Sequence, residues 1–293
     1  MNTTELLIGL CPVIGWGFFP TVSSKIGGRP VHQIFATTLG AFIFALIVAV
    51  ATKTAIPTGS DLVLSIVSGI GWALAQILTF QSFALVGSSK ALPVTTAFQL
   101  MGASLWGVLF LGNWPSTSER ILGGMALILI IIGATLTVWM EKRNQESTNI
   151  MKKAILILAL GEIGYLTYSA APQATNIDGI TAFLPQTMGM LFVALIYSAV
   201  VSLKGRRVFT ERVSYGNIVS GFLFAFAALT YLISAQPNMN GLATGFVLSQ
   251  VCVVVGTLTG IYFLKQPKTK KEMHVTIGGL GLILFAAALT VIG

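Results

Sequence analysis

The chain has 293 residues, of which 55% are hydrophobic and only 9% are charged, and its formal net charge is +8. A soluble domain carries about 25% charged residues. This chain lacks the charge to cover a water-exposed surface, which argues against an ordinary soluble enzyme or binding domain.

Ten apolar runs reach about the 20 residues that a helix needs to cross the hydrocarbon core of a bilayer. Lipid offers no hydrogen-bond partner to a peptide backbone, so each run is predicted to be a helix. The runs are apolar nearly all round, whereas a soluble helical bundle needs amphipathic helices. The sequence therefore predicts an all-α polytopic membrane protein with ten transmembrane helices, at residues 6–24, 31–51, 62–86, 91–111, 120–140, 153–173, 180–203, 214–235, 240–264 and 273–292.

The first run is expected to remain in the protein as a membrane helix. Its start, MNTTELLIGL, lacks the basic region and the small-residue cleavage site of a secretory signal. Cys11 and Cys252 fall within predicted spans and form neither a disulfide framework nor a metal-ligand pattern. We interpret both cysteines as small residues of the helical core.

The distribution of basic residues predicts the orientation in the membrane. All Lys and Arg residues except Lys53 and Arg120 lie in the connections that follow the odd-numbered runs. Short loops rich in Lys and Arg stay in the cytoplasm, so both termini are expected outside the cell. The basic stretch KGRRVFTER, residues 204–212, is then a cytoplasmic loop beside anionic lipid headgroups. The expected partner of these charges is the lipid bilayer and not a nucleic acid.

Two parts of the chain resemble one another at a nearly constant spacing. VIGW at 13–16 aligns with EIGY at 162–165, and ATTLG at 36–40 aligns with PQTMG at 185–189, both at an offset of 149 residues. Each of the latter stretches places a polar pair inside an apolar run, two residues before a glycine. Several matches in the same order indicate an internal repeat.

The repeat divides the chain into residues 1–140 and 153–293, joined by a polar cytoplasmic linker at 141–152. Each part contains five predicted spans, so the second part enters the membrane from the opposite side. Two inverted five-helix repeats are a common architecture of secondary transporters, which bind substrate between the repeats near the bilayer midplane.

Polar residues at that depth are the candidate substrate-binding residues. Gln99 lies about nine residues into the fourth run and Gln250 about ten into the ninth, both near the midplane. A single glutamine could equally hold two helices together, but four glutamines with deep aromatic residues favour a polar cavity. The candidates are Trp16, Thr37, Thr38, Gln76, Gln99, Tyr165, Tyr168, Gln186 and Gln250.

These side chains suit a neutral polyhydroxylated ligand. Amides offer both donors and acceptors, and aromatic faces can pack on the C–H face of a sugar ring. An anionic substrate would need a buried Arg or Lys, and no predicted span carries one near its centre.

Glu162 is the one acidic residue within the core of a predicted helix. It lies about 13 Å from the expected cytoplasmic end, where an ionised carboxylate costs about 3 kcal/mol or more. One interpretation is that Glu162 lines the cavity and exchanges a proton during transport. The other is that Glu162 is a protonated or snorkelling residue bonded to a neighbouring helix.

No motif in the chain indicates an enzyme. The sequence contains neither a phosphate-binding G-x-x-x-x-G-K-[ST] motif nor a dinucleotide-binding fingerprint. We therefore expect no catalytic residue, no cofactor and no bound metal.

Several stretches, including GWGFFP, KIGGRPVHQIFATTLGA, GYLTYSAAPQ, LPQTMGM and FVLSQ, resemble the bacterial glucose/ribose porter family of the drug/metabolite transporter superfamily. The similarity covers almost the whole chain and is strongest to ribose-uptake members. It implies ten helices in two inverted halves, a place in the bacterial cytoplasmic membrane, and proton-driven sugar uptake. The resemblance implies glutamates at the positions of Asn113 and Gln266. If those acids serve proton coupling or gating in the relatives, this chain must manage otherwise, and Glu162 is the expected substitute.

The resulting expectation is a secondary active transporter that imports ribose or glucose by proton symport with alternating access. The alternative is an exporter of drugs, amino acids or other metabolites on the same scaffold.

Overall fold

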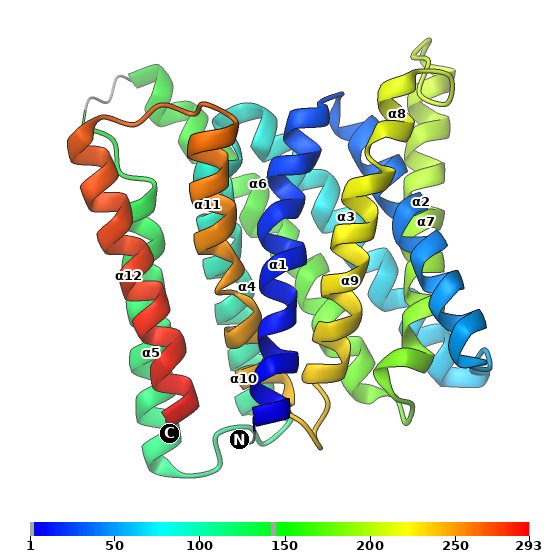
Figure 1. Cartoon of the computed structure of the whole chain (residues 1–293), viewed down its shortest axis with the longest axis horizontal. Coiled ribbons are helices and arrows are strands. Elements are labelled where there is room, and N and C mark those ends of the chain that lie inside the picture. The colour runs from blue at the N-terminus through cyan, green and yellow to red at the C-terminus, as the bar shows by residue number, and fades with distance from the viewer. Residues whose placement is uncertain (1–2, 142–144, 293) are drawn as a thin grey trace.

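The computed structural model describes residues 3–141 and 145–292, which are helical throughout apart from short connections and contain no β-strand. The helices run side by side along one axis of the molecule (Figure 1). They are α1 (Thr3–Ile26), α2 (Pro30–Thr52), α3 (Gly59–Val86), α4 (Ser88–Phe110), α5 (Thr117–Thr137), α6 (Gln145–Ala170), the 3₁₀ turn η1 (Ala171–Ala174), α7 (Gly179–Leu203), α8 (Arg212–Gly216), α9 (Ile218–Ser234), α10 (Gly241–Ser249), α11 (Cys252–Phe263) and α12 (Lys270–Ile292).

The helices confirm a polytopic membrane protein. Nine helical segments within the described residues are long and apolar enough to cross a bilayer. The run expected at 273–292 is also helical, as the 23-residue helix α12, and it packs along α5. α1 begins and α12 ends at the same end of the bundle (Figure 1), as an even number of spans requires.

The ninth predicted span is broken near its middle. α10 ends at Ser249 and α11 begins at Cys252. At the break the Val253 N–H donates to the Gln250 carbonyl three residues earlier, at 3.0 Å. Such tighter turns within a helix often mark a hinge or a functional position, and here the irregular turn contains Gln250.

The linker expected at 141–152 overlaps the start of α6. Residues 142–144 lie outside the described residues, and α6 already begins at Gln145. The stretch QESTNIMKK, residues 145–153, forms the first turns of α6, and its Gln, Glu, Met and Lys residues are well suited to a helix.

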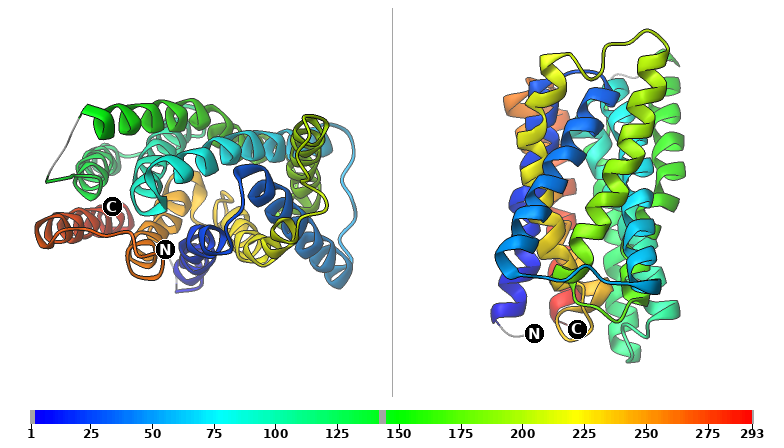
Figure 2. Two further views of the ribbon diagram at one scale, coloured as in Figure 1. Left: turned by 90° about the horizontal axis from the view of Figure 1, so that it is seen from above. Right: turned by 90° about the vertical axis from the view of Figure 1, so that its right-hand side faces the viewer.

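The helices pack in a regular scheme. α3 packs against α6 and α7, while α9 packs against α1 and α2. Three further pairs are α2 with α7, α4 with α11, and α5 with α12. The end-on view in Figure 2 shows α5 and α12 at one side of the bundle, with α2 and α7 at the other. The interior between these two sides is formed by α1, α3, α4, α6, α9 and the broken ninth span.

Candidate functional site

The interior of the bundle contains a cavity with an empty volume of about 510 Å³, including its open part. It lies between α1, α3, α4, α6, α9 and the break between α10 and α11. Aromatic rings, amides and threonine hydroxyls line it, and none of its lining residues carries a charged side chain. The lining residues are Trp16, Phe19, Pro20, Trp72, Gln76, Thr79, Phe83, Leu92, Thr95, Thr96, Gln99, Tyr165, Tyr168, Phe224, Gln250 and Cys252.

One corner of the cavity contains a buried hydrogen-bond network between α3 and α6. The Tyr165 hydroxyl donates to the Gln76 Oε1 atom at 2.8 Å, and the Thr79 hydroxyl lies 2.8 Å from the same phenol oxygen. The Nε2 group of Gln76 is buried and has no hydrogen-bond partner within the described residues. This corner therefore leaves the amide NH₂ group of Gln76 without an acceptor beside the cavity.

The two other cavity glutamines bond through their nitrogens to their own helical segments. Gln99 Nε2 donates to the Thr95 hydroxyl, one turn earlier on α4, at 3.1 Å. Gln250 Nε2 donates to the Ser249 hydroxyl at the helix break, at 3.3 Å. These bonds leave the two amide oxygens available as acceptors for hydroxyl groups of a ligand.

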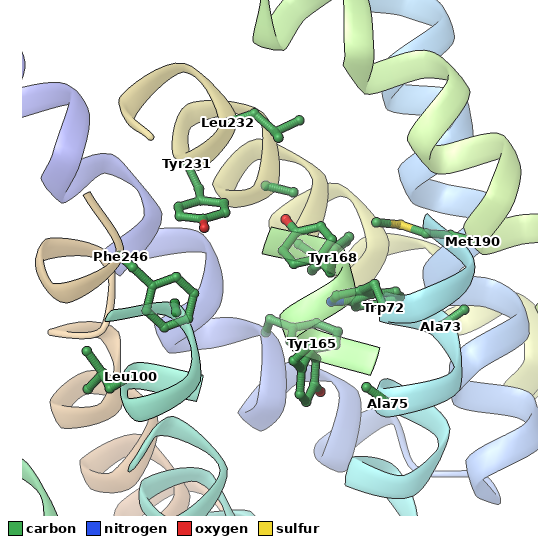
Figure 3. Packing of buried hydrophobic residues seen from close by; sticks show 14 of the residues in the cluster. Trp72, Ala73, Ala75, Leu100, Tyr165, Tyr168, Met190, Tyr231, Leu232 and Phe246 are labelled. Atoms are coloured by element: carbon green, nitrogen blue, oxygen red, sulfur yellow. The ribbon is translucent and has the colours of Figure 1, made fainter. Parts of the chain in front are cut away.

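Aromatic side chains form the remaining wall. The rings of Trp72 and Phe224 lie 4.0 Å apart between centroids, and Trp16 lies 5.3 Å from Tyr231. Tyr168 stacks on Tyr231 at 6.0 Å. Figure 3 shows Trp72 and Tyr168 close together, with the rings of Tyr168 and Tyr231 facing each other. Such surfaces can pack against the C–H face of a sugar ring.

Six of the residues that the sequence singled out lie together in this cavity: Trp16, Gln76, Gln99, Tyr165, Tyr168 and Gln250. Trp72, Thr79 and Thr95 were missed. Trp72 lies four residues before Gln76 and Thr79 lies three residues after it, so all three share one face of α3. Thr95 likewise lies four residues before Gln99 on α4. Helical spacing from each glutamine could have identified all three.

Thr37, Thr38 and Gln186 lie away from the cavity, at crossings between helices. The hydroxyls of Thr37 and Ser220 lie 3.2 Å apart, and Gln186 Nε2 donates to the Ser68 hydroxyl at 2.7 Å. The Thr38 hydroxyl bonds to the Ile34 carbonyl of its own helix at 2.9 Å. None of the three lines this cavity, and the Gln186 Oε1 atom is buried without a hydrogen-bond partner in the described part of the chain. Their assignment as substrate-binding residues stays a prediction.

Glu162 is also not among the residues that line the cavity. Its carboxylate oxygens are buried without a hydrogen-bond partner in the described part of the chain. The carboxylate fills the space left by Gly102 on α4, where a side chain would clash with Glu162 Oε1. Glu162, on α6, thus lies in the contact between α4 and α6. It fits there because Gly102, three residues after Gln99 on α4, has no side chain and leaves space for the carboxylate.

The fold and the cavity define a multi-pass helical membrane protein with an uncharged polar and aromatic cavity inside the bundle. A family model described as "Sugar transport protein" matches residues 7–293. The chain therefore belongs to this sugar transport family, which confirms the resemblance to sugar porters and points to a transporter rather than an enzyme.

Similar proteins agree with this assignment. A protein of Enterococcus faecalis is 66% identical over 293 residues, and one of Lactiplantibacillus plantarum is 61% identical over 292 residues; each alignment covers 99% of both chains. Both relatives have the name "Putative ribose uptake protein RbsU". A solved crystal structure that is 17% identical shares the fold, with a TM-score of 0.68 over 99% of this chain and 96% of the other.

Proposed function

We propose that the protein imports a small neutral sugar, ribose before glucose, across the bacterial cell membrane. The observation that carries this proposal is the uncharged cavity in which three glutamines and several aromatic rings meet inside the bundle. Amide groups match hydroxyls because both can donate and accept. An exporter of apolar drugs would need few of these amides, and the names of the relatives also favour ribose.

The helix packing supports an inverted repeat of residues 1–140 and 153–293. Exchanging the two halves converts the α3–α6 pair into α9–α1, and the α3–α7 pair into α9–α2. The pairs α2–α7, α4–α11 and α5–α12 each convert into themselves. A cavity between two such halves can open to either face as the halves rock, which is the basis for alternating access.

The proposed orientation places both termini outside the cell and the basic loops inside. α1 begins at the end of the bundle opposite to α8 and to the loop of residues 204–211 (Figure 1). Reporter fusions at the two termini and in that loop test this orientation. A reporter that is active in the cytoplasm when fused to the C-terminus would contradict it.

We further propose that Glu162 couples transport to protons. A buried carboxylate without a partner is costly in its ionised form, and Glu162 lies one turn before Tyr165 on α6. Gain or loss of a proton at Glu162 can therefore change the packing of α6 on α4 beside the cavity, even though the carboxylate does not line it.

Uptake of labelled ribose and glucose into proteoliposomes, with and without an inward proton gradient, tests the function. The wild-type protein should concentrate at least one of these sugars only when the gradient is present. Glu162→Gln should let the sugar equilibrate but not accumulate. If the wild-type protein takes up neither ribose nor glucose, the transport proposal is overturned. If Glu162→Gln still accumulates sugar, only the coupling role of Glu162 is overturned.

A further inference from the structure

We propose that Gln76 orients the sugar by donating an amide N–H to one of its oxygens, and that Thr79 and Tyr165 are positioning residues that hold the amide in this orientation. The inference rests on the proposed sugar transport. It changes the role of Tyr165 from a ligand contact to a support for Gln76, and it adds Thr79 to the site.

The first step is the direction of the hydrogen bonds. A glutamine amide can be turned by 180°, and its environment decides which end is a donor. A phenol has one proton, and the Tyr165 hydroxyl uses it to donate to Gln76 Oε1 at 2.8 Å. The amide oxygen is thereby engaged, so the two N–H donors of Gln76 are left on the other side.

The second step is how the phenol is held. The Thr79 hydroxyl, one turn from Gln76 on the same helix, lies 2.8 Å from the Tyr165 oxygen and 3.1 Å from the Ala75 carbonyl oxygen. Because the phenol proton goes to Gln76 Oε1, the single Thr79 proton is directed to the nearer phenol oxygen in the proposed arrangement. Figure 3 shows the Tyr165 hydroxyl directed toward α3 near Ala75. Tyr165 is only 5% exposed and Thr79 only 3% exposed. Both groups are fixed by packing, as a positioning role requires.

The third step is the donor that remains. Gln76 is 4% exposed, and its Nε2 group has no partner within the described residues. A buried donor without an acceptor is unfavourable, and an oxygen of a ligand in the cavity would remove that cost. Gln99 and Gln250 have the opposite arrangement, with their nitrogens engaged. The cavity therefore offers a donor on α3 and acceptors on α4 and at the helix break.

Transport kinetics with ribose and its single-deoxy analogues test this arrangement in proteoliposomes. The wild-type protein should discriminate against one analogue, the one that lacks the oxygen bound by Gln76. Gln76→Met should raise the KM for ribose about tenfold or more, the equivalent of about 1.4 kcal/mol, with little change in maximal rate. It should also transport ribose and that analogue with similar KM values.

Tyr165→Phe and Thr79→Val should show the same loss of discrimination, each to a smaller extent. Tyr165→Phe combined with Gln76→Met should be no worse than Gln76→Met alone, because the phenol acts through the amide. Thr79→Ser keeps the hydroxyl and should restore wild-type behaviour. Thr187→Val and Tyr197→Phe, on α7 outside the cavity lining, are the matched controls and should leave the KM unchanged.

Each contrary outcome has a distinct meaning. Full additivity of Tyr165→Phe and Gln76→Met would overturn the positioning role, because the phenol would then contact the sugar itself. Unchanged discrimination in Gln76→Met, if the variant is still folded and transports ribose, would overturn the role of Gln76. Both results require wild-type uptake in the same vesicles, so absence of wild-type uptake contradicts the proposed function instead.

Discussion

At one helix crossing α3 packs on α7, and at a second crossing α9 packs on α2. At the first crossing Gln186 donates to the Ser68 hydroxyl, and at the second the hydroxyls of Thr37 and Ser220 meet. Gln186 follows Thr37 by 149 residues, and Ser220 follows Ser68 by 152. The same polar contact is thus built twice, from different residue types at corresponding positions.

The corresponding positions beside the cavity have different chemistry. On one side the hydroxyls of Tyr165 and Thr79 are hydrogen-bonded. At the same offsets on the other side are Trp16 and Tyr231, whose rings pack against each other 5.3 Å apart.

Gln76, the amide of the first side, corresponds to Ala228, which has no polar side-chain atom. Helix crossings depend on backbone shape and can be kept the same in both halves. A sugar has no two-fold symmetry, so a cavity that orients it needs a polar side and an apolar side. In the proposed repeat, the two halves are therefore alike where they form the scaffold and unlike where they would contact the proposed ligand.

The largest expected effect comes from breaking a crossing. A side chain at Gly69 would clash with the Gln186 carbonyl, and one at Gly221 would clash with the Thr37 carbonyl. Backbone atoms cannot turn aside, so Gly69→Ala and Gly221→Ala should each destabilise the protein by about 2 kcal/mol or more. Thermal unfolding of the detergent-solubilised protein measures both.

Gly124→Ala on α5 is the control, because an added methyl group there meets no atom of the described residues within 4 Å. It should be neutral or stabilise the helix by up to about 1 kcal/mol. If Gly69→Ala unfolds at the same temperature as Gly124→Ala, the two helices do not approach as closely as the structure indicates. A large effect at only one of the two crossings would show that the halves are less alike than their contacts suggest.

The number of spans and the cavity glutamines could be predicted because the bilayer itself determines them. Its thickness fixes the length of each apolar run, and its low polarity makes Gln76, Gln99 and Gln250 conspicuous. The break at Gln250 could not be predicted, since the surrounding stretch FVLSQVCVVV, residues 246–255, contains neither proline nor glycine.

The rotation of each helix about its own axis, which decides the side chains that face the cavity, also could not be predicted from the sequence. Thr37 and Gln186 lie at a depth where a polar group can be satisfied either by a ligand or by a neighbouring helix, and hydropathy does not distinguish these cases. The deciding feature is the close approach at Gly221 and Gly69, which turns the two side chains toward a serine. Glu162 missed the cavity for a similar reason, because Gly102 on another helix leaves space for its carboxylate.

The second prediction concerns two amides that cap helices beside the cavity, at opposite ends of the bundle. Gln266 Oε1 accepts from the Ser89 N–H of α4, and Asn113 Oδ1 accepts from the Ala243 N–H of α10, both at 3.0 Å. The two positions at which the family resemblance led us to expect glutamates therefore have matching structural roles. Gln266→Ala and Asn113→Ala should each cost about 1–2 kcal/mol by leaving a helix N–H without its acceptor.

Hydrogen exchange should locate each loss at its own end. Gln266→Ala should raise exchange in the first turn of α4, and Asn113→Ala in the first turn of α10. Gln266→Glu and Asn113→Asp keep an acceptor and serve as controls that should retain protection. If either alanine variant raises exchange equally at both ends, the two caps do not act independently.

The third prediction concerns the partly buried ammonium group of Lys268, at a position where the first half has no basic residue. Lys268 corresponds to Pro115, and its ammonium donates to the Thr137 carbonyl at 2.6 Å and to the Thr276 hydroxyl at 2.8 Å. Partial burial, together with the nearby charge of Lys90, lowers the pKa of Lys268 from 10.5 to about 8, against the opposing effect of Glu272.

The folded state disfavours the charged form of Lys268, so this group lowers the free energy of unfolding by its full amount at pH values below 8. Between pH 8 and 10.5 the unfolded chain keeps a proton that the folded protein releases, so the contribution of Lys268 to stability rises with pH. The unfolding temperature of Lys268→Met, relative to wild type, should therefore be highest near pH 7 and fall toward pH 10. Lys270→Met, at an exposed neighbouring position, should follow the wild type; a constant difference for Lys268→Met would refute the shift.

The smallest expected effect is the difference between the N-terminal caps of α5 and α12, the last helix of each proposed half. The Ser116 hydroxyl accepts from the Glu119 N–H while Glu119 accepts from the Ser116 N–H, and Thr269 and Glu272 repeat this reciprocal cap. Ser116→Ala and Thr269→Ala should each cost about 1 kcal/mol or less.

Thr269 also donates to Glu141 Oε2 at 2.9 Å, so its substitution should cost a few tenths of a kcal/mol more, as exposed polar contacts do. Thermal unfolding of both variants measures this difference; the Glu272 carboxylate also accepts the Glu141 N–H at 2.9 Å, a contact that the Thr269 substitution leaves in place. Equal costs would mean that the Glu141 contact contributes nothing to the pairing of α5 with α12, whereas loss of the difference in a Glu141→Gln background would assign it to the charged partner.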